Sequence, residues 1–428
     1  MQLTEFGIMY DTSLLKQVTN NRTLSFRKDL NEIFLLAEAT PSLANSLPLI
    51  DDVINWFAMA FKSNANTNEM NGYWFDFVNM VLQRYAVLFE VELSAADKLV
   101  KNLFQRFLNS TSLKGIRMSY RYNVAPVVFL GRGGARSYYT LPPTLHRPLA
   151  IIHLPRAALN NLWRWNVLAH ETGHDVFFCV DDLAREMDAL VASVAVDALR
   201  AGKADYPPIS TVLKVNGRLT PIEMTREQFT VSLWSKWTNE LFADLFAILM
   251  CGPATVFTMQ EMIGFGSVGS WHGVQGPDPH PLPVLRNLIN LTFMRQLGFS
   301  YHAHIIEHRM LRHNPNVRDV KWVFNGTTEV TRIKLTQFMP MIELITKAML
   351  NYPLQSLNNH SLREVVNFNF HDQAVVDALV DASGGDIIPP QGAEPRHVAA
   401  AAQLAFAFNP YQADKIHNNL INFLIRVK

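Results

Sequence analysis

The stretch that decides the fold reads Ala169-His170-Glu171-Thr172-Gly173-His174-Asp175, in a chain of 428 residues. Its apolar flanks predict a helix over about 158–178. On a helix, His170 and His174 lie four residues apart and project from one face, so both imidazoles can bind one zinc ion. Glu171 is rotated away from that axis, where it can accept a proton from a water molecule instead of binding the metal.

A second motif follows downstream and reads Asn239-Glu240-Leu241-Phe242-Ala243-Asp244. A long helix is predicted over 225–250, and the spacing puts Glu240 and Asp244 on the same face of it. Glu240 can complete a set of two histidines and one glutamate, which leaves a fourth metal position for water. Asp244 can accept the free N–H of a ligand imidazole. The flanks are apolar, so we expect a buried helix whose carboxylates need a partner such as a metal.

These two motifs, His-Glu-x-x-His and then Glu-x-x-Ala-Asp, resemble those of the gluzincin metallopeptidases. With a later His-Pro…Arg, their order over about 155–290 is similar to the heat-shock membrane and CaaX prenyl endopeptidase family, in particular to its soluble branches. The resemblance implies a zincin-like core that holds Zn²⁺, with His280 helping to stabilise an oxyanion and Arg286 orienting a carboxylate. Phe177 and Val180 stand where a metzincin carries Gly and His, which excludes that clan.

The first functional hypothesis is a zinc-dependent peptidase that acts on a peptide or protein substrate. Zinc held by His170, His174 and Glu240 would activate water and polarise the scissile carbonyl. Glu171 would take the proton of that water and pass it to the leaving amine. The segment 149–154, a predicted strand, resembles the edge strand on which gluzincins lay an extended substrate.

Two other hypotheses remain open at this point. The chain could be a helical scaffold or binding protein with a structural or vestigial zinc site. It could also be a zinc hydrolase of non-peptide amides or esters, because water activation is common to both chemistries. A structural zinc usually has a fourth protein ligand. The sequence shows no obvious one, which favours an open, catalytic site.

Composition narrows the class of protein. Apolar residues make up 49% of the chain and charged residues 18%, which is typical of a globular protein and excludes a mainly disordered one. The net charge of +1 gives no general attraction to nucleic acid. Only two cysteines are present, which excludes a disulfide framework and favours a reducing compartment. With no signal peptide or membrane span readable, we expect a cytoplasmic protein; its oligomeric state is not indicated.

The predicted fold is mainly α-helical with one small antiparallel β-sheet. We expect an N-terminal helical region over 1–113, a zincin-like catalytic core over 114–290 and a C-terminal helical region over 291–428. The sheet would come from segments 124–130, 137–141 and 149–154, the first two joined as a hairpin through a glycine-rich turn. Segments 203–222 and 264–283 are predicted as a polar excursion and a Gly/Pro-rich loop.

A competing motif reads His304-Ile305-Ile306-Glu307-His308, an inverted zinc-peptidase pattern. Its polar and basic surroundings favour a half-exposed helix over a second zinc site. Cys179 follows His174 by about one helical turn and is expected to be a packed core thiol. Candidate oxyanion donors by residue type alone are Tyr138, Tyr139 and Tyr301.

Overall fold

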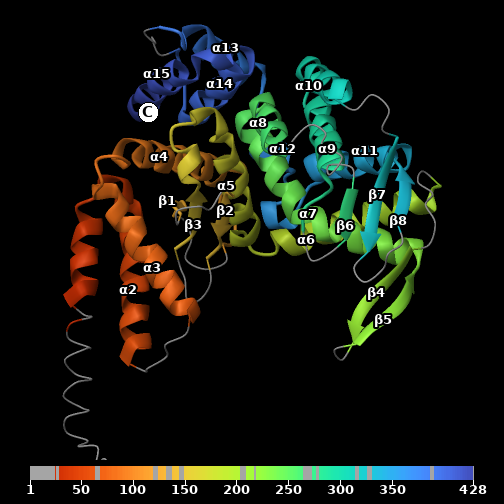
Figure 1. Cartoon of the computed structure of the whole chain (residues 1–428), viewed down its shortest axis with the longest axis horizontal. Coiled ribbons are helices and arrows are strands. Elements are labelled where there is room, and N and C mark those ends of the chain that lie inside the picture. Colours follow the sequence, from red (N-terminus) through yellow and green to blue (C-terminus); the bar gives the residue numbers. More distant parts are fainter. Residues whose placement is uncertain are drawn as a thin grey trace, which may run out of the picture.

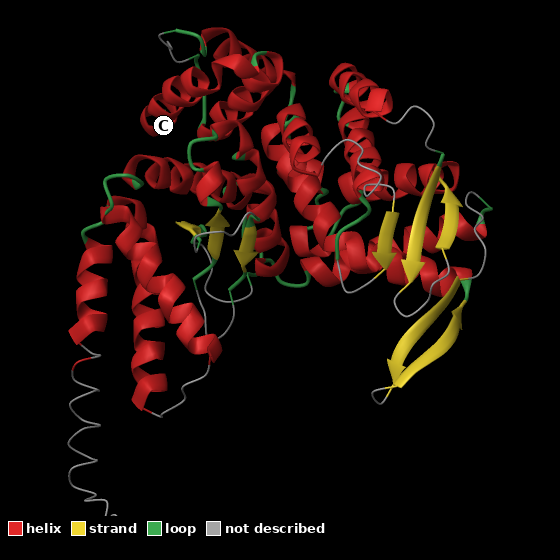
Figure 2. Cartoon of the chain, viewed as in Figure 1, coloured by secondary structure: helices red, strands yellow, loops and turns green. Residues whose placement is uncertain are grey.

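The computed structural model is mainly helical, with small β-sheets at its centre and at one side (Figures 1 and 2). Among its described residues, no single helix is long and apolar enough to cross a membrane. The described residues are 25, 28–62, 68–118, 124–131, 137–143, 149–202, 209–215, 218–263, 272–275, 279–313, 318–324, 330–385 and 390–427.

The central sheet has the order β1-β3-β2, formed by β1 (Val127–Leu130), β2 (Tyr139–Leu141) and β3 (Ile151–Leu154). β3 runs parallel to β1 and antiparallel to β2. The predicted all-antiparallel sheet is therefore wrong, and so is the predicted hairpin, because β3 lies between the two strands that it would join. The prediction that 149–154 is an edge strand is also wrong. Every residue of β3 is buried, as in a central strand, whereas β2 is partly exposed and forms an edge.

This sheet separates two hydrophobic cores. Alternate residues such as Val128 and Ile152 face a large core that extends from α4 to the C-terminal helices. Their neighbours Val127 and Ile151 face a smaller core made with the N-terminal helices. Those helices span Lys28–Glu38, α2 (Leu47–Lys62) and α3 (Asn68–Leu82), while α4 (Glu90–Leu108) belongs to the large core. The boundaries at 113 and 290 stay predictions.

Two further sheets were not predicted. β4 (Ile209–Val215) and β5 (Arg218–Met224) pair as a hairpin that projects from the helical body in Figure 1, where the sequence indicated a polar excursion. The other sheet has three strands, β6 (His272–Gln275), β7 (Asp319–Phe324) and β8 (Val330–Lys334). Part of the predicted loop over 264–283 is therefore a strand. Most of these strands carry β-branched residues at short intervals, which favours extended backbone even beside Gly and Pro.

Three helices in the large core position the candidate site: α5 (Asn166–Cys179), α7 (Arg226–Cys251) and α9 (Pro283–Gln296). α5 begins later than predicted, after two short 3₁₀ turns. α7 starts with a capping box between Thr225 and Gln228, and it ends at Gly252, whose φ of 64° only glycine adopts readily. The predicted long helix and its termination are confirmed.

α5 and α7 pack closely because residue 173 is glycine. A Cβ atom at this position would lie 2.8 Å from the backbone Cα of Ala243. In the part of the chain that the structure describes, the other α-helices are α6 (Leu183–Arg200), α8 (Pro253–Ile263), α10 (Ser300–His313), α11 (Leu335–Asn351), α12 (Leu362–Val365), α13 (Phe370–Ala382), α14 (Pro395–Phe408) and α15 (Ala413–Arg426).

Candidate metal centre

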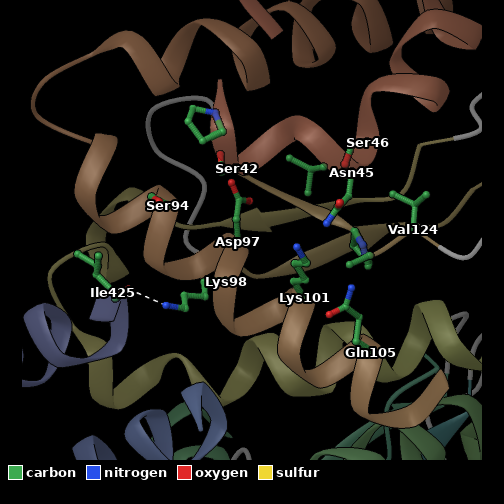
Figure 3. A pocket seen from close by; sticks show the side chains of 14 residues that line it. Ser42, Asn45, Ser46, Ser94, Asp97, Lys98, Lys101, Gln105, Val124 and Ile425 are labelled. Atoms are coloured by element: carbon green, nitrogen blue, oxygen red, sulfur yellow. Dashed lines mark hydrogen bonds between the residues drawn. The ribbon is translucent and has the colours of Figure 1, made fainter. Parts of the chain in front are cut away.

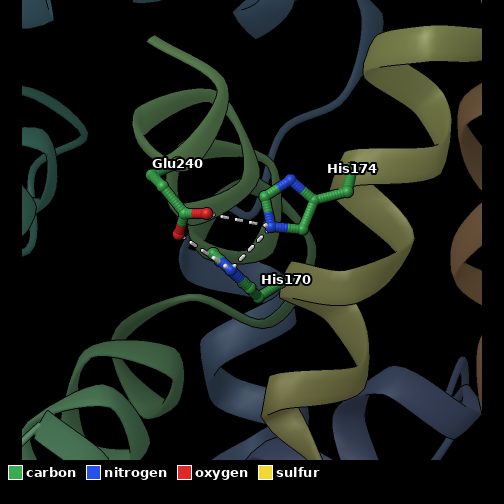
Figure 4. Close-up of side chains that lie close together, drawn as sticks. All are labelled: His170, His174 and Glu240. Carbon is green, nitrogen blue, oxygen red and sulfur yellow. Dashed lines mark hydrogen bonds and ion pairs between the residues drawn. The ribbon is translucent and has the colours of Figure 1, made fainter. Parts of the chain in front are cut away.

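The two predicted motifs meet where α5 crosses α7 (Figure 4). The Nε2 atoms of His170 and His174 lie 3.0 Å apart. The carboxylate of Glu240 is 3.5 Å from the Nε2 atom of His170 and 3.6 Å from that of His174. All three side chains are buried, with donor atoms that converge on one point. The structure therefore brings together three groups that could hold a metal ion.

The spacing of these donor atoms fits one tetrahedrally coordinated ion. Ligands about 2.0–2.2 Å from a tetrahedral metal lie about 3.3–3.6 Å from one another. The two separations that involve Glu240, 3.5 and 3.6 Å, lie in this range, and the 3.0 Å between the two histidine nitrogens is slightly shorter. The Oε2 atom of Glu240 is buried and lies 3.1 Å from the Nη2 atom of Arg286 and 3.5 Å from His170, without a hydrogen bond of good geometry to either. A cation between the three donors would give this oxygen a further partner.

Each histidine is held through its other ring nitrogen. The Nδ1 atom of His170 lies 2.9 Å from the Oδ1 atom of Asp244, which is fully buried. The Nδ1 atom of His174 lies 2.9 Å from the amide oxygen of Asn239. If each Nδ1 carries the proton and donates it to these oxygens, both Nε2 lone pairs point at the proposed metal position.

Arg286 on α9 contacts two carboxylates of α7, those of Asp244 and Glu240. Its guanidinium donates two hydrogen bonds of 2.7 Å to Asp244, and its Nη2 atom lies 3.1 Å from Glu240. The amide of Asn290, one turn further along α9, donates a 3.0 Å hydrogen bond to Asp244. Burial by itself would raise the pKa of Asp244, but Arg286 outweighs it and holds that pKa far below the usual range. Asp244 therefore stays ionised.

Glu171 is buried beside the triad but is not one of its three donors. Burial raises the pKa of Glu171 to about 7, against the lowering effect of the charge on His170. The backbone N–H of Thr140, on the edge strand β2, donates a hydrogen bond to it. A carboxyl group with a pKa near neutrality can both accept and return a proton.

Asp175 extends the link between α5 and β2. The hydroxyl of Thr140 lies 3.0 and 3.1 Å from its two carboxylate oxygens, so it can donate to either one. Asp175 is fully buried, and this burial raises its pKa well above the usual value. One threonine thus contacts two acidic side chains of α5, through its backbone and its hydroxyl.

The two histidines of the metal-free protein differ in protonation. Burial alone would lower the pKa of His170, but hydrogen bonds to Asp244 and Glu240 outweigh it and raise this pKa to about 9. Burial and the charge on His170 lower the pKa of His174 to about 4. Near neutral pH, one proton is therefore held at His170, and a metal must displace it.

The other predicted candidates lie in different settings. The Nε2 atom of His280 is 3.4 Å from Glu240, and its side chain is half exposed. Tyr138 has a buried hydroxyl with no hydrogen-bond partner in the described structure, and burial raises the pKa of this hydroxyl. Tyr139 stacks on His153, and Tyr301 is exposed on α10.

The inverted motif does not form a comparable cluster among the described residues. The rings of His304 and His308 are 6.4 Å apart, and Glu307 pairs with Arg295 instead. Cys179 is buried, and burial raises the pKa of its thiol, as expected for a core cysteine.

Sequence reasoning gave no role to several side chains at the site. Asn239 stands directly before Glu240 in the chain, so the sequence already placed it beside a candidate metal ligand. Asn290 follows Arg286 by four residues, which puts both on one face of α9. No sequence signal pointed to Thr140, because its contacts depend on where β2 lies relative to α5.

Comparison of the chain with protein-family models, with curated proteins and with solved structures finds no match. Within the described residues, His170, His174 and Glu240 form the one group of three or more metal-binding side chain types with donor atoms close enough to share an ion. Assignment of a chemistry to this group therefore rests on its own geometry and electrostatics.

Proposed function

We propose that the chain is a zinc-dependent peptidase in which His170, His174 and Glu240 hold the metal. The observation that carries the proposal is the convergence of these three donors at 3.0–3.6 Å, with Glu171 beside them and outside the set. Two imidazoles and one carboxylate are a donor set typical of catalytic zinc. Bound zinc would supply Lewis acidity, which polarises a carbonyl and lowers the pKa of water.

Glu171 would act as the general base and then the general acid. Its place beside the three donors and outside their set would let it take a proton from the attacking water and return it to the leaving amine. Asp244 and Asn239 would keep the histidine rings oriented, and Arg286 would hold Asp244 and Glu240 in place. His280, next to Glu240 and half exposed, could donate a hydrogen bond to the substrate oxygen.

The edge strand β2 favours a peptide over other amides and esters. It pairs with β3 on one side, and among the described residues no strand pairs with its other side. An extended peptide can add to such an edge through backbone hydrogen bonds. Thr140 of this strand also contacts Glu171, so a peptide on β2 would lie next to the proposed base.

A scaffold with a structural zinc site is the alternative from another class. A structural site usually uses four protein ligands, and the described residues supply a group of three. Fewer ligands leave a position for water, which supports catalysis.

The test compares metal content and peptide cleavage in the wild type and three variants. Glu171→Gln should keep one zinc per chain and lose turnover. Glu240→Ala should lose zinc, and Glu227→Gln, at an exposed glutamate on the same helix, should change neither property. Cleavage would be followed with a broad library of unstructured peptides. A Glu171→Gln protein as active as the wild type would overturn the peptidase mechanism, and zinc retained by Glu240→Ala would overturn the ligand set.

A further inference from the structure

A cavity lies apart from the candidate metal centre (Figure 3). Its walls are a 3₁₀ turn over Pro41–Ser46, one face of α4, the segment that enters β1, and the end of α15. None of its lining residues belongs to α5, α7 or α9. Its volume of about 590 Å³ lies within the range of small-molecule sites.

The lining face of α4 is polar. Ser94, Lys98, Lys101 and Gln105 follow one another at helical spacing and line the cavity, while the opposite face of α4 is buried in the large core. Asn45 faces this row from the 3₁₀ turn, and Figure 3 shows its amide and the Lys101 ammonium projecting into the same space. Five polar side chains from two separate segments therefore line the cavity, with Lys98 directed toward Ile425 and Lys101 toward Asn45 (Figure 3).

The charge of this cavity is positive. Its acidic lining residue, Asp97, is already neutralised by Arg84, which donates three hydrogen bonds to it, and it also accepts one from the backbone N–H of Val128. Lys98 donates to the backbone carbonyl of Ile425 at 2.6 Å and has no carboxylate partner in the described structure. Lys101 makes neither an ion pair nor a hydrogen bond in the described structure. Burial lowers the pKa of Lys98, as expected for an ammonium group that lacks a counter-ion.

We propose that this cavity binds a small organic oxyanion, either a phosphate ester or a polycarboxylate. Lys98 and Lys101 supply the cationic contacts through charge-assisted hydrogen bonds. Asn45, Ser94 and Gln105 supply donors and acceptors for hydroxyl or carbonyl groups elsewhere on the ligand. The volume exceeds what a bare inorganic anion needs, which favours an organic molecule.

The test measures binding by isothermal titration calorimetry at low ionic strength. The probes are glycerol 3-phosphate and citrate, with glycerol as the uncharged control. Lys101→Gln is the informative variant, because Lys101 makes no described contact that the fold needs. Loss of one charge-assisted contact should weaken binding by about ten- to a hundredfold. Lys114→Gln, at an exposed lysine outside the cavity, is the matched control and should bind as the wild type does.

The outcomes separate specific binding from general attraction to lysines. Binding of one probe but not the other supports the site and identifies the ligand class. The proposal is overturned if neither anion binds saturably, or if Lys101→Gln and Lys114→Gln bind the anion equally well. Binding that persists in Glu240→Ala shows that the cavity acts independently of the proposed zinc site.

Discussion

Gly173 offers a sharp test of how the fold builds the candidate metal centre. A Cβ atom at this position would lie 2.8 Å from the Cα atom of Ala243 and 3.2 Å from its carbonyl oxygen. Both are backbone atoms of α7, so they cannot rotate away as the end of a flexible side chain can. To reach an ordinary contact of 3.4 Å, α5 and α7 would have to separate by about 0.6 Å.

This displacement is large for a metal site. His170 and His174 are on α5 and Glu240 is on α7, so the proposed ligand set spans the interface that would open. Metal–ligand distances tolerate about 0.2 Å, roughly a third of the required shift. For Gly173→Ala we therefore expect about 10–100-fold weaker zinc binding. Overpacking should also cost about 1–3 kcal/mol of folding stability.

The assay has two readouts that separate these effects. Zinc affinity is measured by competition with a chromophoric chelator, and thermal unfolding is measured on the metal-free protein. Gly385→Ala is the matched control, because a Cβ atom there meets open space and its φ is not in the left-handed region. Unchanged affinity and an unchanged melting temperature in Gly173→Ala would refute the close helix contact. A lower melting temperature with unchanged affinity would refute its link to the metal.

Three more predictions concern protons and supporting contacts. Because the pKa of His170 is about 9, the metal-free protein holds a proton that zinc must displace. Apparent zinc affinity should therefore rise about tenfold per pH unit from pH 7 to 9 and level off above, as chelator competition would show. Asn239→Leu removes the hydrogen-bond partner of His174 and should weaken zinc binding by about 10–100-fold in the same assay. An unchanged zinc affinity in this variant would contradict the role of Asn239. Thr140→Val removes the hydroxyl beside buried Asp175 and should cost about 1–3 kcal/mol in thermal unfolding. Thr140→Ser should restore most of this loss.

The pairing of residues within each of the two motifs was accessible from the sequence because it depends on local geometry. Helical spacing fixes which residues share a face, so His170 with His174, and Glu240 with Asp244, could be paired without knowledge of the fold. The apolar flanks of the second motif indicated a buried helix, and buried carboxylates need partners. The sequence could not show which ring nitrogen each partner would contact, because that depends on the distance between α5 and α7.

The order of the strands was not accessible in the same way. Strand pairing joins residues that are far apart in the chain, and two apolar segments separated by a glycine-rich stretch are compatible with a hairpin. One signal did exist. The segment over 149–154 is apolar at nearly every position, which is typical of a central strand, whereas Tyr139 and Thr140 give β2 polar groups suited to an edge. Family resemblance outweighed this pattern and led to the wrong edge.

Arg286 shows why a third helix is needed at the site. Asp244 is fully buried, and a buried carboxylate without enough opposing charge and hydrogen-bond donors would be costly to ionise. Arg286 supplies the opposing charge with two hydrogen bonds, and Asn290 supplies a third donor from the same helix. With these three hydrogen bonds to its carboxylate, Asp244 can stay ionised and orient His170. α9 therefore keeps Asp244 ionised beside the proposed ligand set, although it contributes no ligand of its own. The residues around the two motifs on α5 and α7 are for this reason not enough to account for the site.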